Sequence, residues 1–479
     1  MKLSPLTVLK GSFLLVTLVT LGLFLSHGVG IVTSPFQYDY GEGFHWFISD
    51  SFSRGESIYK DINTEPYITA VYTPLYYLVN AGLFKVLGSH LWVGRLVSLV
   101  SILAAAYFIY KIVYWKTESR LVAVPSGLLL FTVWYLSLWT VLFRVDSLAL
   151  ALTLAGMYVA VRNLTTKGIL WSVPLFVLAF YTKQVYLAAP LAVGIYLLLK
   201  DRKLAAQFGG LYVGLVSLLL GVAMWITGGY FWEHTFLVGS QPFSTGKWAY
   251  LVVLAVLGAP AVLAVGSAYL VSSLRKCRVP DVLLIYFLLA LAIALVGMAK
   301  EGAWLNYFIE SVAAASILVG LQLKRLESGG LLLPFAYGVV AALSLISART
   351  WVIPSFPEYT SEAYSKISGY MQEVGSDIIS EDAALLMRNG GGILWEPSVF
   401  VLGGYYKTVW DQTPFVEDLE SKRFDLIVLN YDVNTWWLPQ GDLPYPVPHE
   451  RLTEEMATAI VGSYQLKDNI GNYWVYEPN

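Results

Sequence analysis

Residues 11–43 read GSFLLVTLVTLGLFLSHGVGIVTSPFQYDYGEG, and this stretch decides the class of fold. The apolar run at about 11–32 has the roughly 20 residues that a helix needs to cross the hydrocarbon core of a bilayer. The segment SPFQYDY that follows is not a small-residue cleavage site, so we expect a retained first span rather than a signal peptide. Two carboxylates, Asp39 and Glu42, stand where the chain leaves the membrane.

The composition excludes a water-soluble protein. Of the 479 residues, 57% are hydrophobic and 13% are charged, and the mean hydropathy is +0.61. Soluble domains carry about 25% charged residues, so lipid is the expected solvent of this chain. The net charge of −2 gives no reason to expect a nucleic acid as partner. Cys277 is the single cysteine, which excludes a disulfide within the chain.

Apolar segments that are candidates for membrane spans recur along residues 1–349. We expect an α-helical polytopic membrane protein of about 11 transmembrane helices. The candidate spans are 11–32, 93–114, 121–139, 146–162, 169–182, 185–199, 207–226, 249–273, 281–299, 306–323 and 330–348. One further segment, VYTPLYYLVNAGLFKVLG at 71–88, is either a span or a juxtamembrane helix on the membrane surface, and the choice reverses every later span.

Basic residues decide between the two topologies, because cytoplasmic loops carry an excess of Lys and Arg. Alternate loops after residue 93 form a basic set of Lys111, Lys116, Arg120, Arg162, Lys167, Lys200, Arg202, Lys203, Arg275, Lys276, Arg278, Lys324 and Arg325. The other loops hold only Arg144, Lys183, Lys247 and Lys300. We therefore expect a multi-pass protein of the cell (cytoplasmic) membrane with its N-terminus inside. Segment 71–88 then lies on the outer membrane surface, within an external loop at about 33–92.

The tail at about 350–479 differs in character from the membrane part. It carries charge runs such as EDLESKR and alternates strand-like with helix-like stretches. The stretch FDLIVLNY at 424–431 is typical of a buried strand, and NIGNYWVYEP at 469–478 predicts a late strand or hairpin. We expect residues 350–479 to form a small extracytoplasmic α/β domain, separate from the membrane module at 1–349.

In this topology the unusual polar residues gather on the external side of the membrane. Charged groups at membrane depth are costly and are functional candidates by default. The candidates are Asp39, Glu42, Arg144, Asp146, Lys183, Gln184, His234, Lys300, Asn306, Tyr307 and Glu310. A transporter is expected to place polar residues near the midplane instead, and the spans here are apolar through their centres. The cations suit a lipid-linked phosphate, and the carboxylates suit deprotonation of an acceptor hydroxyl.

Several of these motifs, taken in order, resemble the GT-C superfamily of membrane glycosyltransferases. The acidic motif YDYGEG is followed by the proline–aromatic segment YTPLYYLVNAGLFKVLG and by GRLVSLV. The segments RVDSLALAL, TKQ, NYFIE, SEDAALLM and WDQTPFVEDL extend the resemblance over nearly the whole chain. The branches that it resembles are the protein mannosyltransferase and aminoarabinose transferase relatives (family 39-like), which use polyprenyl-phosphate sugars.

The resemblance implies a donor sugar on a polyprenyl or dolichyl monophosphate and transfer on the outer face, usually with inversion. It implies that the acid of the first external loop is the base or orients the acceptor, which is Asp39 here, with Glu42 as second candidate. The remaining candidates would bind the donor phosphate and sugar. The adjacent Asp-Glu pair of the protein mannosyltransferases is absent, because the two acids here stand three residues apart. Monophosphate-dependent branches generally need no metal, so no cofactor is expected, although a divalent metal stays open.

Simpler interpretations stay open for most of these residues. Asp39 and Glu42 are also explained as solvated loop acids or helix caps. Lys183 is also explained as an interfacial lysine, and His234 as a structural histidine. A non-enzymatic polyprenyl-lipid flippase or a scaffold for surface assembly is the alternative function. The sequence does not identify the sugar, or whether the acceptor is a glycan, a lipid or a protein.

Overall fold

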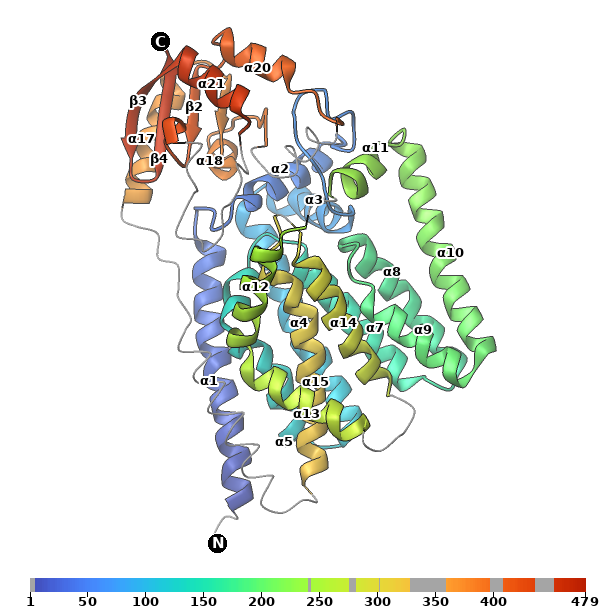
Figure 1. The fold of residues 1–479 in the computed structure, drawn as a ribbon. Helices are drawn as coiled ribbons and strands as arrows, with labels where there is room; N and C mark the ends of the chain where they lie inside the picture. Colours follow the sequence, from blue (N-terminus) through green and yellow to red (C-terminus); the bar gives the residue numbers. More distant parts are fainter. Residues whose placement is uncertain are drawn as a thin grey trace.

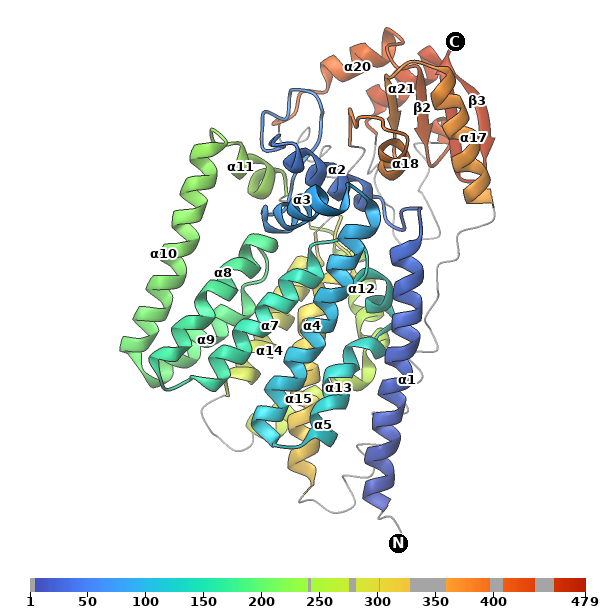
Figure 2. The ribbon, with the colours of Figure 1, turned by 180° about the vertical axis from the view of Figure 1, so that it is seen from behind.

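A long bundle of helices carries a small mixed domain at one end (Figures 1 and 2). The computed structural model describes residues 5–239, 243–274, 281–300, 302–327, 359–396, 408–435 and 452–479. The N-terminus lies at the far end of the bundle, and the C-terminus lies in the mixed domain (Figure 1). The predicted last span at 330–348 lies outside the described residues.

The bundle is built from apolar helices, several of them shorter than a full span. Its helices are α1 (Pro5–Thr33), α4 (Leu91–Thr117), α5 (Arg120–Leu128), α6 (Trp134–Trp139), α7 (Asp146–Arg162), α8 (Val173–Thr182), α9 (Ala188–Lys200), α10 (Arg202–Ile226), α12 (Thr245–Gly258), α13 (Pro260–Leu274), α14 (Val282–Gly297) and α15 (Ile309–Leu326). Short 3-10 turns η1 (Leu129–Thr132), η2 (Lys167–Ser172) and η4 (Leu305–Phe308) lead into or out of them.

The apolar helices of the bundle agree with a multi-pass membrane protein. Among the described residues, four helices are long and apolar enough to cross a bilayer: Thr7–Thr33, Leu91–Thr117, Arg202–Ile226 and Leu305–Leu326. The last of these is 94% buried along its apolar window, whereas none of the apolar window of α10 is buried. Helix α10 lies at the edge of the bundle (Figure 1). An apolar helix that no other part of the protein covers is stable in lipid, because its backbone bonds are satisfied internally.

The predicted span at 249–273 is divided in the structure. Helices α12 and α13 meet at a bend of 90°, so the segment is a broken span or a re-entrant pair. Pro260 opens α13, and its ring disfavours the helical conformation for the residue before it. Ala259 accordingly has φ −131° and ψ 41°. The predicted span at 121–139 is likewise divided, into α5, η1 and α6. The total number of spans stays a prediction.

Two short helices form a layer between the bundle and the mixed domain (Figure 1). They are α2 (Gly41–Ser53) and α3 (Leu75–Leu87), which pack on each other. Each has 13 residues and therefore a length of about 20 Å, which is too short to cross the hydrocarbon core. The helix in the segment at 71–88 is therefore short, as expected for a juxtamembrane helix.

The tail forms a four-stranded sheet with helices around it. Its elements are α17 (Tyr359–Glu373), β1 (Ile378–Ser380), α18 (Ala383–Arg388), α20 (Thr413–Glu420), β2 (Leu426–Leu429), α21 (Glu454–Ser463), β3 (Tyr464–Ile470) and β4 (Tyr473–Pro478). The strand order is β1-β2-β4-β3, with β1 parallel to β2 and the other pairs antiparallel. The buried strand predicted at 424–431 is β2, and the hairpin predicted at 469–478 is the turn from β3 into β4.

The mixed domain and the first loop share one hydrophobic core. Side chains of α2 and α3 pack in the same cluster as Leu385 of α18 and Val475 of β4. Gly43 of α2 lies so close to α18 that an added Cβ would come 2.4 Å from the backbone nitrogen of Ala384. The backbone of Tyr67 forms a parallel bridge with Trp395. The tail is therefore docked on the layer that carries the YDYGEG motif.

Candidate active site

The turn after α1 is held by a buried ion pair. Glu42 accepts hydrogen bonds from Arg95 Nε at 2.8 Å and Arg95 Nη2 at 2.7 Å, and from two backbone N–H groups, those of Tyr38 and Phe143, at 2.8 Å each. Neither charged side chain is exposed. Arg95 also donates to the backbone carbonyls of the turn, at Ile31, Ser34 and Phe36. Glu42 therefore fixes the position of this turn, because both of its carboxylate oxygens are bonded.

Asp39 contacts a different cation. Its Oδ1 pairs with Arg144 Nη2 and accepts the N–H of Gly41 at 3.0 Å. The Asp39 side chain is 17% exposed, and among the described residues its Oδ2 forms no hydrogen bond or ion pair. An added Cβ on Gly41 would lie 2.3 Å from Arg144 Nη2, so the guanidinium packs directly on this glycine. Asp39 thus presents one carboxylate oxygen for a further partner.

His45 is held behind Arg144. Arg144 Nη1 lies 3.2 Å from His45 Nε2, and His45 Nδ1 lies 3.1 Å from Tyr77 Oη. Because a guanidinium only donates, Nε2 must accept, so the proton of a neutral ring is on Nδ1 and is donated to Tyr77. Burial lowers the pKa of His45 to about 3, so the ring is neutral at physiological pH.

A second ion pair lies at the start of α7. Asp146 Oδ1 accepts from Lys183 Nζ at 2.6 Å and from Asn306 Nδ2 at 3.2 Å. Both charged side chains are buried. Lys183 Nζ also lies over the rings of Tyr72 and Tyr307, at 5.4 and 4.9 Å from their centroids. Residues from α7, from the turn after α8, from the loop between α2 and α3 and from η4 thus converge on one point.

Trp139 joins the two ion pairs into one site. The Arg144 guanidinium lies over the Trp139 ring at 5.0 Å, and Trp139 Nε1 donates to Asp146 Oδ2 at 3.2 Å. Arg144 and Asp146, two positions apart, therefore pair with different partners rather than with each other.

Other predicted residues lie around this centre in supporting contacts. Gln184 Nε2 donates to the carbonyls of Val71 and Thr235, at 2.8 and 3.2 Å. His234 accepts the N–H of Ala70 at Nδ1, and its Nε2 lies 2.7 Å from the Lys60 carbonyl. Burial lowers the pKa of His234, so this ring too is neutral. These two side chains hold the strand-like segment at 67–73 in place.

Two predicted residues lie apart from the ion pairs in different ways. Glu310 is buried in α15, and its Oε1 has no hydrogen-bond partner among the described residues. Lys300 lies in the turn after α14, where its backbone bridges to Phe243, and no ion pair of its side chain occurs among the described residues. Neither side chain contacts Asp39 or Asp146 in the structure as described.

The sequence analysis missed several residues of this site, among them His45, Arg95, Trp139 and Glu396. Arg95 stands in the GRLVSLV motif and His45 follows YDYGEG, so the motifs that carried the resemblance also held these residues. Glu396 comes from the tail. It accepts hydrogen bonds from the N–H and the hydroxyl of Thr69 at 2.8 Å each, and its negative charge favours the charged form of Arg144. No local spacing indicates this contact. Among the described residues, no group of three or more His, Cys, Asp or Glu is placed to hold a metal ion.

Comparison with known proteins places this geometry in context. A family model described as Dolichyl-phosphate-mannose-protein mannosyltransferase matches residues 71–226. The crystal structure of ArnT from Cupriavidus metallidurans bound to undecaprenyl phosphate matches with a TM-score of 0.63 at 13% identity, over 95% of this chain and 97% of that chain. This chain has the GT-C fold. The apo structure of the same ArnT gives a TM-score of 0.64 at 12% identity, over 96% of this chain and 97% of that chain.

The predicted fold class and the GT-C resemblance are therefore confirmed. The family match covers α3 to α10 and includes Arg95, Arg144, Asp146 and Lys183. At this level of identity the structural likeness shows the fold alone. A search of curated proteins finds no match.

Proposed function

We propose that this protein is a glycosyltransferase that moves a sugar from a polyprenyl monophosphate to an acceptor hydroxyl on the outer face of the membrane. The observation that carries the proposal is the coupled arrangement of Asp39–Arg144 and Asp146–Lys183 around Trp139. Asp39 stands two residues before α2, and α2 lies between the bundle and the mixed domain (Figure 1). The family match over residues 71–226 and the undecaprenyl phosphate bound to ArnT support this class of donor.

The two cations have the chemistry needed at the leaving group. Charge develops on the phosphate oxygen as the glycosidic bond breaks, and fixed cations stabilise it best when water is excluded. Lys183 and Arg144 are both buried, and each is held by a carboxylate and by aromatic rings. Guanidinium and ammonium groups are the usual phosphate ligands in proteins. In the proposed site the donor phosphate replaces part of the contacts that Arg144 makes with Asp39 and Lys183 makes with Asp146.

Asp39 is the proposed base, because its Oδ2 is the carboxylate oxygen left available. The acceptor oxygen attacks the anomeric carbon from the face opposite the phosphate, and its proton passes to Asp39. The bond between that carbon and the phosphate oxygen breaks, and its electron pair leaves with the polyprenyl phosphate. The product is an inverted glycoside. Glu42 takes no part in this step, since its oxygens are already engaged by Arg95 and by two backbone N–H groups.

The side of the membrane on which the site lies is proposed from the predicted topology. With Lys2 and the basic loops inside, the first loop, the site and the mixed domain are on the outer face. We propose further that the reaction needs no metal, because two protein cations meet the phosphate. The mixed domain is proposed to limit access to the site, since Glu396 bonds the segment at 67–73 that flanks it.

The experiment measures release of polyprenyl phosphate by the purified protein in lipid. A panel of polyprenyl-phosphate sugars is supplied with membrane extract as acceptor. Asp39→Asn is run beside Glu56→Gln, which changes an acid of the same loop whose side chain is 61% exposed. We expect turnover in the wild type and in Glu56→Gln, and none in Asp39→Asn, which should still bind the donor.

The same experiment separates the alternative functions. A flippase or scaffold would bind the lipid-linked sugar without releasing polyprenyl phosphate, and Asp39→Asn would then behave as the wild type. Moving donor from one leaflet to the other without turnover in sealed vesicles would favour the flippase. Chelation of divalent metal during the assay tests the proposed absence of a metal: a loss of turnover restored by added metal would reject it.

A further inference from the structure

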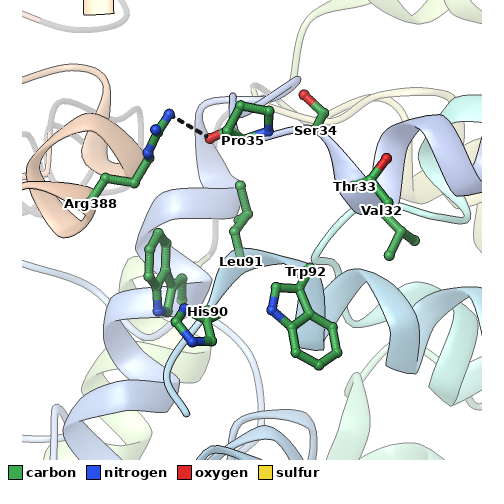
Figure 3. Close-up of a pocket in the computed structure, with 9 residues that line it drawn as sticks. Val32, Thr33, Ser34, Pro35, His90, Leu91, Trp92 and Arg388 are labelled. Carbon is green, nitrogen blue, oxygen red and sulfur yellow. Dashed lines mark hydrogen bonds between the residues drawn. The ribbon is translucent and has the colours of Figure 1, made fainter. Parts of the chain in front are cut away.

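A hollow lies beside the end of α1, outside the candidate active site. Its volume is about 440 Å³. Figure 3 shows the residues that line it: Val32, Thr33, Ser34, Pro35, Trp46, His90, Leu91, Trp92 and Arg388. They come from the end of α1, from α2, from the start of α4 and from α18 of the mixed domain. One side of the hollow, at Arg388, is therefore supplied by the docked tail.

The lining combines aromatic rings with one fixed positive charge. Trp92 is 37% exposed, and the ring of His90 stacks on it with centroids 6.3 Å apart. Trp46 is buried and donates from Nε1 to Ser89 Oγ at 2.8 Å. Arg388 is the one lining residue that is charged at all ordinary pH values.

Arg388 is positioned over the hollow by its surroundings. Its Nη1 donates to the Pro35 carbonyl at 3.4 Å across the hollow (Figure 3), and its guanidinium lies over the rings of Phe36 and Tyr364, at 5.9 and 5.5 Å. Among the described residues no carboxylate pairs with it. Arg388 is exposed, and among the residues that the structure describes it uses one of its five N–H donors, on the Pro35 carbonyl. The chemistry that matches the remaining planar set of donors is a phosphate.

The hollow lies where lipid headgroups are expected. It begins at Val32 and Thr33, the last residues of the candidate span Thr7–Thr33, and at Trp92, at the start of the candidate span Leu91–Thr117. Tryptophan is enriched at the boundary between hydrocarbon and water, because its ring is apolar and its N–H is polar. If the candidate spans cross the bilayer, the apolar sides of α1 and α4 face the hydrocarbon, and Arg388 of the mixed domain is at the headgroup side.

We propose that this hollow, called the groove from here on, binds the phosphate head of an anionic phospholipid of the outer leaflet, with Arg388 as its phosphate ligand. The acyl chains would lie along α1 and α4, and the headgroup would bridge the membrane module and the mixed domain. The turn at 31–36 separates this groove from the candidate site, because Arg95 holds the inner side of that turn through three carbonyls. A lipid in the groove would therefore support the turn from outside without entering the reaction.

The test compares vesicles of pure phosphatidylcholine with vesicles that also hold phosphatidylglycerol. Full-length protein is reconstituted in each, and lipid that stays bound after mild detergent extraction is measured by native mass spectrometry. We expect the wild type to retain phosphatidylglycerol in preference. Arg388→Gln should lose about tenfold or more of this preference, and Arg388→Lys should keep part of it. Trp92→Ala tests the apolar side of the groove and should lose some of it.

The control is Lys422→Gln, which removes an exposed cation elsewhere on the mixed domain and should leave the preference unchanged. Equal retention of the two lipids by the wild type would overturn the proposal, as would an unchanged preference in Arg388→Gln. A further arm adds inorganic phosphate to protein in neutral detergent. If phosphate alone displaces phosphatidylglycerol at low millimolar concentration, the groove is a site for free phosphate and the lipid assignment is wrong. None of these readouts depends on sugar transfer.

Discussion

Glu42 and Arg95 form an ion pair in which neither side chain is exposed, with Arg95 Nη2 2.7 Å from Glu42 Oε2. Three residues before Glu42, Asp39 pairs with Arg144 and keeps part of its side chain accessible. The two acids of YDYGEG therefore differ in environment, although nothing in their local spacing distinguishes them. One acid ties the first loop to α4, and the other faces the site.

The first prediction uses this difference in environment. Glu42→Gln should lower the free energy of unfolding by about 3–5 kcal/mol, because it leaves Arg95 buried without its counter-charge. The measurement is the thermal transition in detergent, compared between Glu42→Gln, Asp39→Asn and Glu56→Gln. We expect a large shift for Glu42→Gln and none for Glu56→Gln. If Glu42→Gln were as stable as the wild type and yet inactive, Glu42 would belong to the chemistry and the assignment to Asp39 would be wrong.

The second prediction concerns the space between Gly41 and Arg144. Gly41→Ala puts a Cβ where the Arg144 guanidinium now lies, so Arg144 must move away from Asp39. Misplacing a catalytic group by about 1 Å can cost about a hundredfold in rate, and we expect a loss of about ten- to a hundredfold. The measurement is turnover of polyprenyl-phosphate sugar at saturating donor.

Gly82→Ala is the matched control for this prediction. It lies in α3, which packs on α2 in the layer between the bundle and the mixed domain, and an added Cβ there meets nothing within 4 Å. Its turnover should equal that of the wild type. Equal turnover in Gly41→Ala would instead mean that the position of Arg144 does not matter to the reaction.

The third prediction is a dependence of stability on pH that arises at His45. Burial lowers the pKa of His45 to about 3 in the folded protein, against about 6.5 when it is exposed. Between these values the unfolded chain binds a proton that the folded chain does not. The stabilisation is therefore complete above pH 6.5 and is lost as the pH falls, by at most about 1.4 kcal/mol per pH unit.

The measurement for His45 is the thermal transition between pH 8 and pH 5 in neutral detergent. His45→Asn should flatten this dependence without abolishing it, because His234 is buried with a lowered pKa as well. His90→Asn removes an exposed histidine and should leave the dependence as in the wild type. A slope that is identical in the wild type and His45→Asn would contradict the neutral, buried state of His45.

Local patterns singled out several of the polar residues that the structure brings together, but not their pairings. Charged residues are costly in lipid, so those that flank apolar segments stand out in the sequence. Pairing depends on contacts between distant segments: Glu42 with Arg95 is 53 positions apart, and Asp146 with Lys183 is 37. Glu396 and Thr69, which are hydrogen-bonded, are 327 positions apart. The break at Ala259 had a local signal in the proline that follows, and apolar composition alone concealed it.

The last prediction concerns the buried pair of Lys183 and Asp146. Lys183→Met alone should destabilise the protein by about 3–5 kcal/mol, because Asp146 is then buried without its cation. In Lys183→Met with Asp146→Asn no uncompensated charge is left, and we expect most of the stability to return. Donor binding should not return in the double variant, because the proposed phosphate ligand is still missing.

Two measurements separate these effects, namely the thermal transition and the binding of polyprenyl phosphate by titration calorimetry. The double variant should be near the wild type in the first and at least about tenfold weaker in the second. Lys85→Met, an exposed lysine of α3, is the control and should match the wild type in both. If the double variant bound polyprenyl phosphate as tightly as the wild type, Lys183 would have only a structural role. Arg144 alone would then stabilise the charge on the leaving phosphate.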